Sequence, residues 1–77
     1  MIIESQELRE AVGSLLKRKR EDKGLSMRKL SELIYGHSNN DKVISNIENG
    51  KVSPDVSTLN KILLHLDINL IEIFNKI

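Results

Sequence analysis

The 77-residue sequence contains no cysteine, a single proline, four glycines and no long apolar run. The absence of cysteine excludes a disulfide framework and a cysteine-based zinc finger. It is compatible with a protein of the reducing cytosol. With 39% hydrophobic and 30% charged residues, the chain is neither fibrous nor disordered. No apolar stretch approaches the roughly 18 residues of a membrane span, and residues 1–5 lack the pattern of a signal peptide. We therefore expect one small cytoplasmic domain over residues 1–77, with no membrane segment.

Signals for catalysis or metal binding are also scarce. His37 and His65 are isolated from each other and have neither partner cysteines nor a short His-x-x-x-His spacing. No glycine-rich phosphate loop follows a strand, and no pair of carboxylates falls in a predicted pocket. A chain of this length leaves scarcely any room for a catalytic cleft. We expect a protein that is not an enzyme and that uses no metal and no small-molecule cofactor.

The charge of the chain is nearly balanced, with a formal net charge of +1. Its distribution therefore matters more than its sum. A basic run at residues 17–20, Lys-Arg-Lys-Arg, is followed directly by Glu21 and Asp22. Such a run is more often a solvated helix face than a binding patch.

Helix signals run along almost the whole chain, and strand signals are absent. Residues that are good N-caps stand ahead of five stretches whose apolar residues recur at helical spacing. They are Ser5, Ser26, Asn40, Ser53 and Asn69. Pro54 would take the first position of the fourth helix, where its missing N–H costs nothing. Glu72 would complete a capping box with Asn69.

The ends of the first three helices are predicted at glycines, because a residue that tolerates positive φ releases the chain from a helix. These are Gly24, Gly36 and Gly50, and residues 37–39 are predicted to form a loop. The expected inward residues are Leu8, Val12, Leu15, Leu16, Leu30, Leu33, Ile34, Ile44, Ile47, Val56, Leu59, Ile62, Leu63, Leu66, Leu70, Ile73 and Phe74. Val43 is left open between core and surface. The pattern predicts an all-α domain of five short helices.

Short hydrogen-bonding side chains make up the outward face of the third helix, at about residues 40–49. They are Asn40, Asp41, Lys42, Ser45, Asn46 and Asn49. Such a set is a poor face for a membrane or a protein core. It suits base edges, because asparagine pairs bidentate with adenine while serine and lysine reach base acceptors. The capped helix before it completes a helix-turn-helix over about residues 26–50, whose second helix reads the DNA.

Residues that match a known family extend from about Val12 to Phe74. They are Leu16, Arg20, Gly24, Leu25, Ser26, Leu30, Ile44, Ser45, Ile47, Glu48, Asn49, Gly50, Pro54, Leu59, Leu66 and Ile68. The most specific segment is "ISNIENG" at residues 44–50, followed by Ser-Pro. With these residues the chain resembles the lambda-repressor-like helix-turn-helix family of Cro and XRE regulators. The resemblance implies a five-helix fold in a bacterial or phage-like, nucleoid-associated protein.

The resemblance also implies roles for individual residues. Those expected to contact bases are Asn40, Asp41, Lys42, Val43, Ser45 and Asn46. Asn49 and Lys51 match positions that meet phosphate in the family. Ser26, Met27 and Arg28 at the start of the second helix are the further candidates for phosphate contact, with the alternatives that Arg28 is solvated and that Met27 covers apolar surface. Arg20 and Glu48 match a pair that forms an internal salt bridge in relatives, so we expect Arg20 to join helices rather than to bind DNA.

Three features depart from the family pattern. About three extra residues lengthen the turn within Tyr35–Asn40. Met27 stands where the family usually has a glutamine that touches DNA. Asp41 stands where a basic or polar residue is common, and its carboxylate repels phosphate while it can accept a hydrogen bond from cytosine. All three concern the docking geometry and the base preference rather than the fold.

Two functions from different classes fit these observations. The first is a repressor-like transcriptional regulator that binds specific double-stranded DNA sequences as a homodimer. The second is a protein-interaction module, such as an antitoxin or an adaptor. Apolar residues off the inward stripes predict a homodimer contact, since a cluster of exposed apolar residues marks an interface. They are Leu64, Ile71, Phe74 and Ile77, with the alternative that the last two complete the core.

Overall fold

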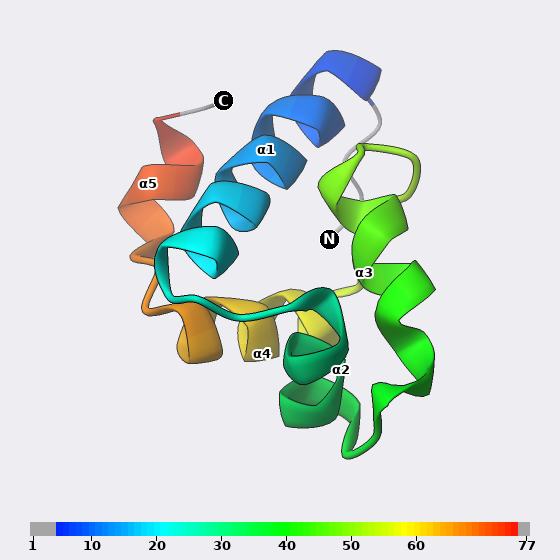
Figure 1. The fold of residues 1–77 in the computed structure, drawn as a ribbon. Coiled ribbons are helices and arrows are strands. Elements are labelled where there is room, and N and C mark those ends of the chain that lie inside the picture. Colours follow the sequence, from blue (N-terminus) through cyan, green and yellow to red (C-terminus); the bar gives the residue numbers. More distant parts are fainter. Residues whose placement is uncertain (1–4, 76–77) are drawn as a thin grey trace.

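The computed structural model describes residues 5–75, apart from the side chains of Leu70 and Phe74. The described part consists of five α-helices and one turn of 3-10 helix, and contains no strand. The elements are α1 (Gln6–Asp22), α2 (Met27–Tyr35), η1 (Ser38–Asn40), α3 (Asp41–Glu48), α4 (Val56–Leu66) and α5 (Leu70–Phe74). In Figure 1, α1 lies between α5 and α3, with α2 and α4 below it. The expected all-α, five-helix fold is confirmed.

Three of the predicted N-caps are present. The hydroxyls of Ser5 and Ser26 accept hydrogen bonds from backbone N–H groups in the first turns of α1 and α2. Asn69 and Glu72 form the predicted capping box at the start of α5. These helix starts follow from local chemistry, because each cap satisfies N–H groups that have no partner within the helix.

The predicted start of α4 is wrong. Asp55, rather than Ser53, is the N-cap, and its carboxylate accepts a hydrogen bond from the Thr58 N–H at 2.7 Å. The helix begins at Val56, so Pro54 precedes the cap and is buried. Serine and aspartate are N-caps of similar strength, so the local sequence did not decide between them.

The segment before α3 also differs from the prediction. Residues expected to form a loop make the 3-10 turn η1, and His37 caps it by accepting the Asn39 N–H on its Nδ1 atom at 3.3 Å. Asn40 stands at the N-cap position of α3, but its side chain makes no capping hydrogen bond. η1 leads directly into α3, and no side-chain hydrogen bond from the N-cap residue holds the start of α3.

The core forms where α1, α2, α3 and α4 meet, and residues after α4 complete it. Its buried members are Val12, Leu15, Leu16, Leu30, Ile34, Ile44, Ile47, Ile62, Leu66, Ile68 and Ile73. Two predicted core residues are wrong, since Leu33 is 39% exposed and Val56 is 60% exposed. Both lie at the edge of an apolar stripe, where the neighbouring helices rather than the spacing decide burial. No helix of the described part has both the length and the apolar character to cross a membrane.

Candidate nucleic-acid interface

One side of α3 is packed and the other is open. Ile44 and Ile47 are buried in the core. Lys42 is exposed, and Val43, which the sequence left open, is 39% exposed. The exposed part of α3 therefore combines one cation with one apolar side chain.

The remaining side chains expected to read bases are less open than predicted. Asn40, Asp41, Ser45 and Asn46 are half-buried, while Asn49 is exposed. A partly covered short side chain is reached only by a ligand that lies close along the helix.

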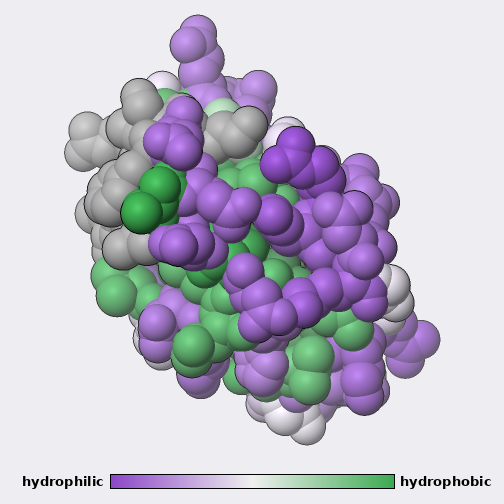
Figure 2. Space-filling view, turned by 90° about the vertical axis from the view of Figure 1, so that its left-hand side faces the viewer, coloured by the Kyte–Doolittle hydropathy of each residue, from purple (hydrophilic) through white to green (hydrophobic). Residues whose placement is uncertain are grey.

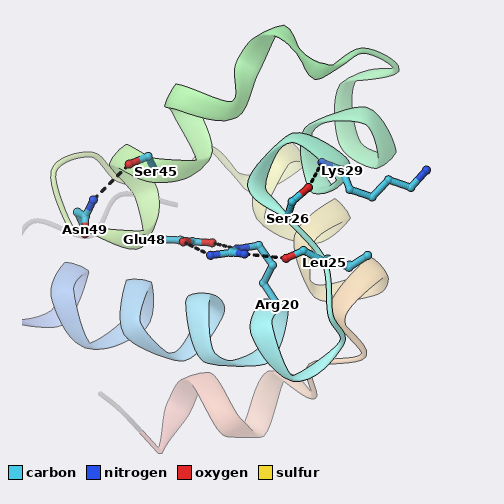
Figure 3. A network of polar contacts seen from close by, with 7 residues as sticks. All are labelled: Arg20, Leu25, Ser26, Lys29, Ser45, Glu48 and Asn49. Atoms are coloured by element: carbon cyan, nitrogen blue, oxygen red, sulfur yellow. Dashed lines mark hydrogen bonds and ion pairs between the residues drawn. The ribbon is translucent and has the colours of Figure 1, made fainter.

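Ser45 and Asn49 are linked across one turn of α3 (Figure 3). The Nδ2 atom of Asn49 donates to the Oγ atom of Ser45 at 3.3 Å. A serine hydroxyl has one proton to donate and lone pairs to accept with. Because Ser45 accepts from Asn49, its own proton stays available for an acceptor outside the helix.

A buried ion pair attaches α3 to α1. The Nε and Nη2 atoms of Arg20 donate to the two carboxylate oxygens of Glu48 at 2.6 and 3.1 Å. A third bond runs from Nη1 to the backbone oxygen of Leu25 at 2.7 Å, and Figure 3 shows Arg20 pointing from α1 toward α3. The hydrogen bond with Glu48 raises the pKa of Arg20 above its ordinary value. The guanidinium is thus committed to an internal contact.

The other residues of the basic run separate into two kinds. Lys19 forms an ion pair with Glu72 of α5 at 2.9 Å and is half-buried. Lys17 and Arg18 are exposed. The solvated face of this run is therefore limited to Lys17 and Arg18, because Lys19 and Arg20 hold α5 and α3 against α1.

Two glycines let α1 lie close to the end of α3. A Cβ atom at Gly13 would lie 2.5 Å from the backbone oxygens of both Ile47 and Glu48. At Gly50, which has a φ of +72°, a Cβ atom would lie 2.6 Å from the Cγ atom of Glu10. No role was predicted for Gly13. The signal was a glycine inside an otherwise helical stretch, which often marks a close approach.

Arg9 adds a further contact at the same place. Its Nε atom donates to the backbone oxygen of Gly50 at 3.2 Å. This oxygen follows the C-terminal end of α3, where carbonyl groups lack partners within the helix. Together with the ion pair at Glu48, the contact fixes the far end of α3 against α1.

The turn between α2 and α3 is bridged by a serine for which no role was predicted. Ser31 of α2 is fully buried. Its Oγ atom donates to the backbone oxygen of His37 at 2.8 Å and accepts from the Asn40 N–H at 3.2 Å. The rings of Tyr35 and His37, which belong to the same turn, stack with centroids 6.4 Å apart. The signal in the sequence was a serine that lies between apolar residues of a predicted helix.

The candidates for phosphate contact differ in availability. Arg28 and Lys51 are exposed. Ser26 already accepts the Lys29 N–H at 3.0 Å as the cap of α2. Met27 is half-buried and packs against the core. The exposed cations, together with Asn49, are therefore the members of the set best placed to reach a ligand.

Two of the apolar residues predicted to lie off the inward stripes are exposed. Leu64 of α4 is 68% exposed and Ile71 of α5 is 62% exposed. Figure 2 faces the α5 side, where hydrophobic side chains gather over the centre and lower part among hydrophilic ones. The side chain of Phe74 and the whole of Ile77 lie outside the described residues.

Fold and surface together define a helix-turn-helix protein in which α2 supports a polar α3. A family model described as helix-turn-helix matches residues 16–73. The chain belongs to this family, the Cro/C1-type helix-turn-helix proteins, which are DNA-binding transcriptional regulators. It is similar to the crystal structure of the clp gene regulator ClgR from Corynebacterium glutamicum. The TM-score is 0.76 at 26% identity, covering 90% of this chain and 70% of that chain. A comparison with curated proteins gives no match.

Proposed function

We propose that the protein regulates transcription by occupying a specific double-stranded DNA operator as a homodimer, with α3 in the major groove. The outward face of α3 carries this proposal. It combines exposed Lys42 and Val43 with half-buried polar side chains, while the opposite side of α3 packs into the core through Ile44 and Ile47. The family supports DNA binding, and the ClgR regulator shows that a similar fold occurs in a gene regulator. The protein would act by occupancy rather than by catalysis.

The proposed base contacts follow from the chemistry of each side chain. The set is Asn40, Asp41, Lys42, Val43, Ser45 and Asn46. Val43 suits the methyl group of thymine, and Asn46 suits the N6 and N7 atoms of adenine. Lys42 and the available proton of Ser45 suit base acceptors, while Asp41 can accept from the N4 atom of cytosine. This mixture of donors, an acceptor and an apolar group favours readout of a mixed sequence.

The proposed phosphate contacts come from both ends of the helix-turn-helix. They are Ser26, Met27 and Arg28 at the start of α2, and Asn49 and Lys51 at the end of α3. Arg28 and Lys51 supply the positive charge, and the others contribute position or hydrogen bonds. Phosphate contacts fix the register of a protein on the duplex without specifying a sequence.

The proposed homodimer uses the C-terminal surface. Leu64 and Ile71 expose apolar area that a second copy would cover, and Phe74 and Ile77 are the further members of the proposed contact. A small domain contacts few base pairs, so two copies on half-sites about 34 Å apart would double the sequence that is recognised. The same surface supports the alternative function, a protein-interaction module such as an antitoxin or adaptor.

Selection of bound fragments from random duplex DNA tests the proposal. We expect enrichment of a two-fold symmetric motif, with half-sites about 10 base pairs apart centre to centre. The matched control carries Lys42→Ala, Ser45→Ala and Asn46→Ala together, which should keep the fold and enrich nothing. A plot of the logarithm of the binding constant against the logarithm of the salt concentration should have a slope of about −0.9 for each neutralised phosphate. A folded wild-type protein that enriches no motif would favour the protein-interaction module.

A further inference from the structure

We propose that Ser31 is a positioning residue whose buried hydroxyl sets the pose of α3 and thereby its discrimination between DNA sequences. The inference rests on the proposed function, in which α3 reads the DNA. It adds the residue that holds α3 in the orientation needed for reading. Ser31 touches no DNA in this proposal. It lies in α2, under the turn that leads into the reading helix.

The bridge ties both ends of the turn to one atom. The Oγ–H group of Ser31 donates to the His37 backbone oxygen at 2.8 Å, just before η1. A lone pair of the same oxygen accepts the N–H of Asn40 at 3.2 Å, the last residue of η1. The two bonds use the donor and an acceptor site of one hydroxyl, which fixes its rotation. Ser31 is completely buried, so water does not compete for its hydroxyl in the folded protein.

The start of α3 depends on this bridge because no local cap holds it. The side chain of Asn40 makes no capping hydrogen bond, although the residue occupies the N-cap position. Asp41 and Lys42 follow immediately and begin the proposed reading face. The far end of α3 is fixed by Arg20 through Glu48. Ser31 therefore supplies the second anchor, at the end where the reading face begins.

The two kinds of DNA contact respond differently to a change in pose. Hydrogen bonds to base edges require donor and acceptor within narrow limits of distance and angle. Contacts from long cationic side chains such as Arg28 and Lys51 tolerate small shifts and carry no sequence information. Loss of the bridge should therefore weaken binding to the selected sequence and spare binding to unrelated duplex.

Two substitutions separate the hydrogen bonds of Ser31 from its volume. Ser31→Ala removes both bonds and leaves a small void, whereas Ser31→Cys fills the space with a weak hydrogen-bonding group. Each should lower the ratio of specific to non-specific affinity by about tenfold, the loss expected when one base contact is no longer aligned. The control is Ser14→Ala in α1, which truncates an exposed serine. Affinities are measured at a temperature at which circular dichroism shows every variant folded.

Three results would overturn the inference. An unchanged ratio in both variants would show that the bridge does not aim α3. Equal losses on specific and unrelated duplex would make Ser31 merely structural. A wild-type ratio in Ser31→Cys with a lowered one in Ser31→Ala would assign the effect to packing.

Hydrogen exchange in the DNA-free protein gives a readout that does not depend on the proposed function. In Ser31→Ala, the amide of Asn40 should lose more of its protection than the amides of Ile62 and Leu66 in α4, which report any loss of global stability. Unchanged exchange at Asn40 would overturn the inference whatever the DNA results. If the wild-type protein selects no duplex while Asn40 exchange still rises in the variant, the proposed function fails and the bridge stands as an anchor of α3.

Discussion

Arg20 and Glu48 are 28 residues apart in the sequence and meet as a two-point ion pair between α1 and α3. Only 8% of the Arg20 side chain and 2% of the Glu48 side chain remain exposed. A guanidinium and a carboxylate in this geometry fit each other through two parallel hydrogen bonds. The pair fixes the orientation of α3 on α1 and keeps a basic residue of the 17–20 run away from solvent.

Removing the guanidinium should destabilise the protein. Arg20→Ala leaves the carboxylate of Glu48 buried and unpaired, and we expect a loss of about 3–5 kcal/mol in the free energy of unfolding. Urea denaturation measures it, with Arg18→Ala, an exposed arginine of the same helix, as the control. An unchanged melting temperature together with a large loss of DNA affinity would instead make Arg20 a DNA contact.

A methyl group at position 13 should force α1 and α3 apart. An alanine inside a helix normally stabilises relative to glycine by about 0.5–1 kcal/mol. Here the Cβ atom would meet backbone oxygens at 2.5 Å, and backbone cannot move aside as a side chain does. We expect Gly13→Ala to destabilise by about 1–3 kcal/mol. The neighbouring Ser14→Ala is the control, and a Gly13→Ala protein more resistant to urea than wild type would contradict the close packing.

Truncation of the reading face should weaken specific binding without unfolding the protein. Ser45→Ala and Asn46→Ala should each cost about 1–3 kcal/mol on the selected operator and little on unrelated duplex. Titration of both duplexes by fluorescence anisotropy measures the difference. Lys61→Ala, which removes an exposed lysine from α4, serves as the control for general charge effects. If both α3 variants bind every duplex as the wild type does, α3 is not the reader.

Charges on the C-terminal apolar surface should prevent dimerisation. Leu64 and Ile71 are exposed, so Leu64→Lys combined with Ile71→Lys should leave the fold intact while making burial against a second copy costly. Sedimentation equilibrium should show a monomer at concentrations at which the wild type dimerises. Val52→Lys, at an exposed valine between α3 and α4, is the matched control. A folded double variant that dimerises like the wild type would place the interface elsewhere.

Acid should loosen the attachment of α5 to α1. The hydrogen bond from Lys19, followed by that from the Asn69 N–H, holds the pKa of Glu72 below its ordinary value of 4.5. A carboxyl whose pKa is lowered by folding contributes stability that is complete above the ordinary value. That contribution disappears as the pH falls through the lowered pKa.

Unfolding curves measured in steps from about pH 6 to about pH 3, the range in which carboxyls titrate, test this pH dependence. Glu72→Gln should flatten the dependence of stability on pH below 4.5, the ordinary value for Glu72. Asp22→Asn, which neutralises an exposed carboxylate at the end of α1, is the control. Asp67, whose pKa is lowered by its bond with Lys23, should keep part of the acid sensitivity in the Glu72 variant.

The sequence alone determined the features that depend on neighbouring residues. Capping at Ser5, Ser26 and Asn69 follows from side chains within three residues of the N–H groups that they satisfy. The helix ends at glycines follow from backbone conformation, and the recurrence of apolar residues follows from the helical period. Together these two signals sufficed to predict the all-α fold. The pairing of Arg20 with Glu48 was implied by a resemblance to a family, since neither residue indicates the other locally.

Tertiary structure decided the features that depend on which surfaces meet. That Asp55 rather than Ser53 caps α4 is seen only in the structure, because serine and aspartate are N-caps of similar strength. The role of Gly13 required α3 to lie against it. Ser31 could not be assigned from sequence, because its partners are backbone groups that only a folded turn brings to its hydroxyl. Side-chain chemistry acts over a few ångströms, and only the packed chain brings distant residues within that range.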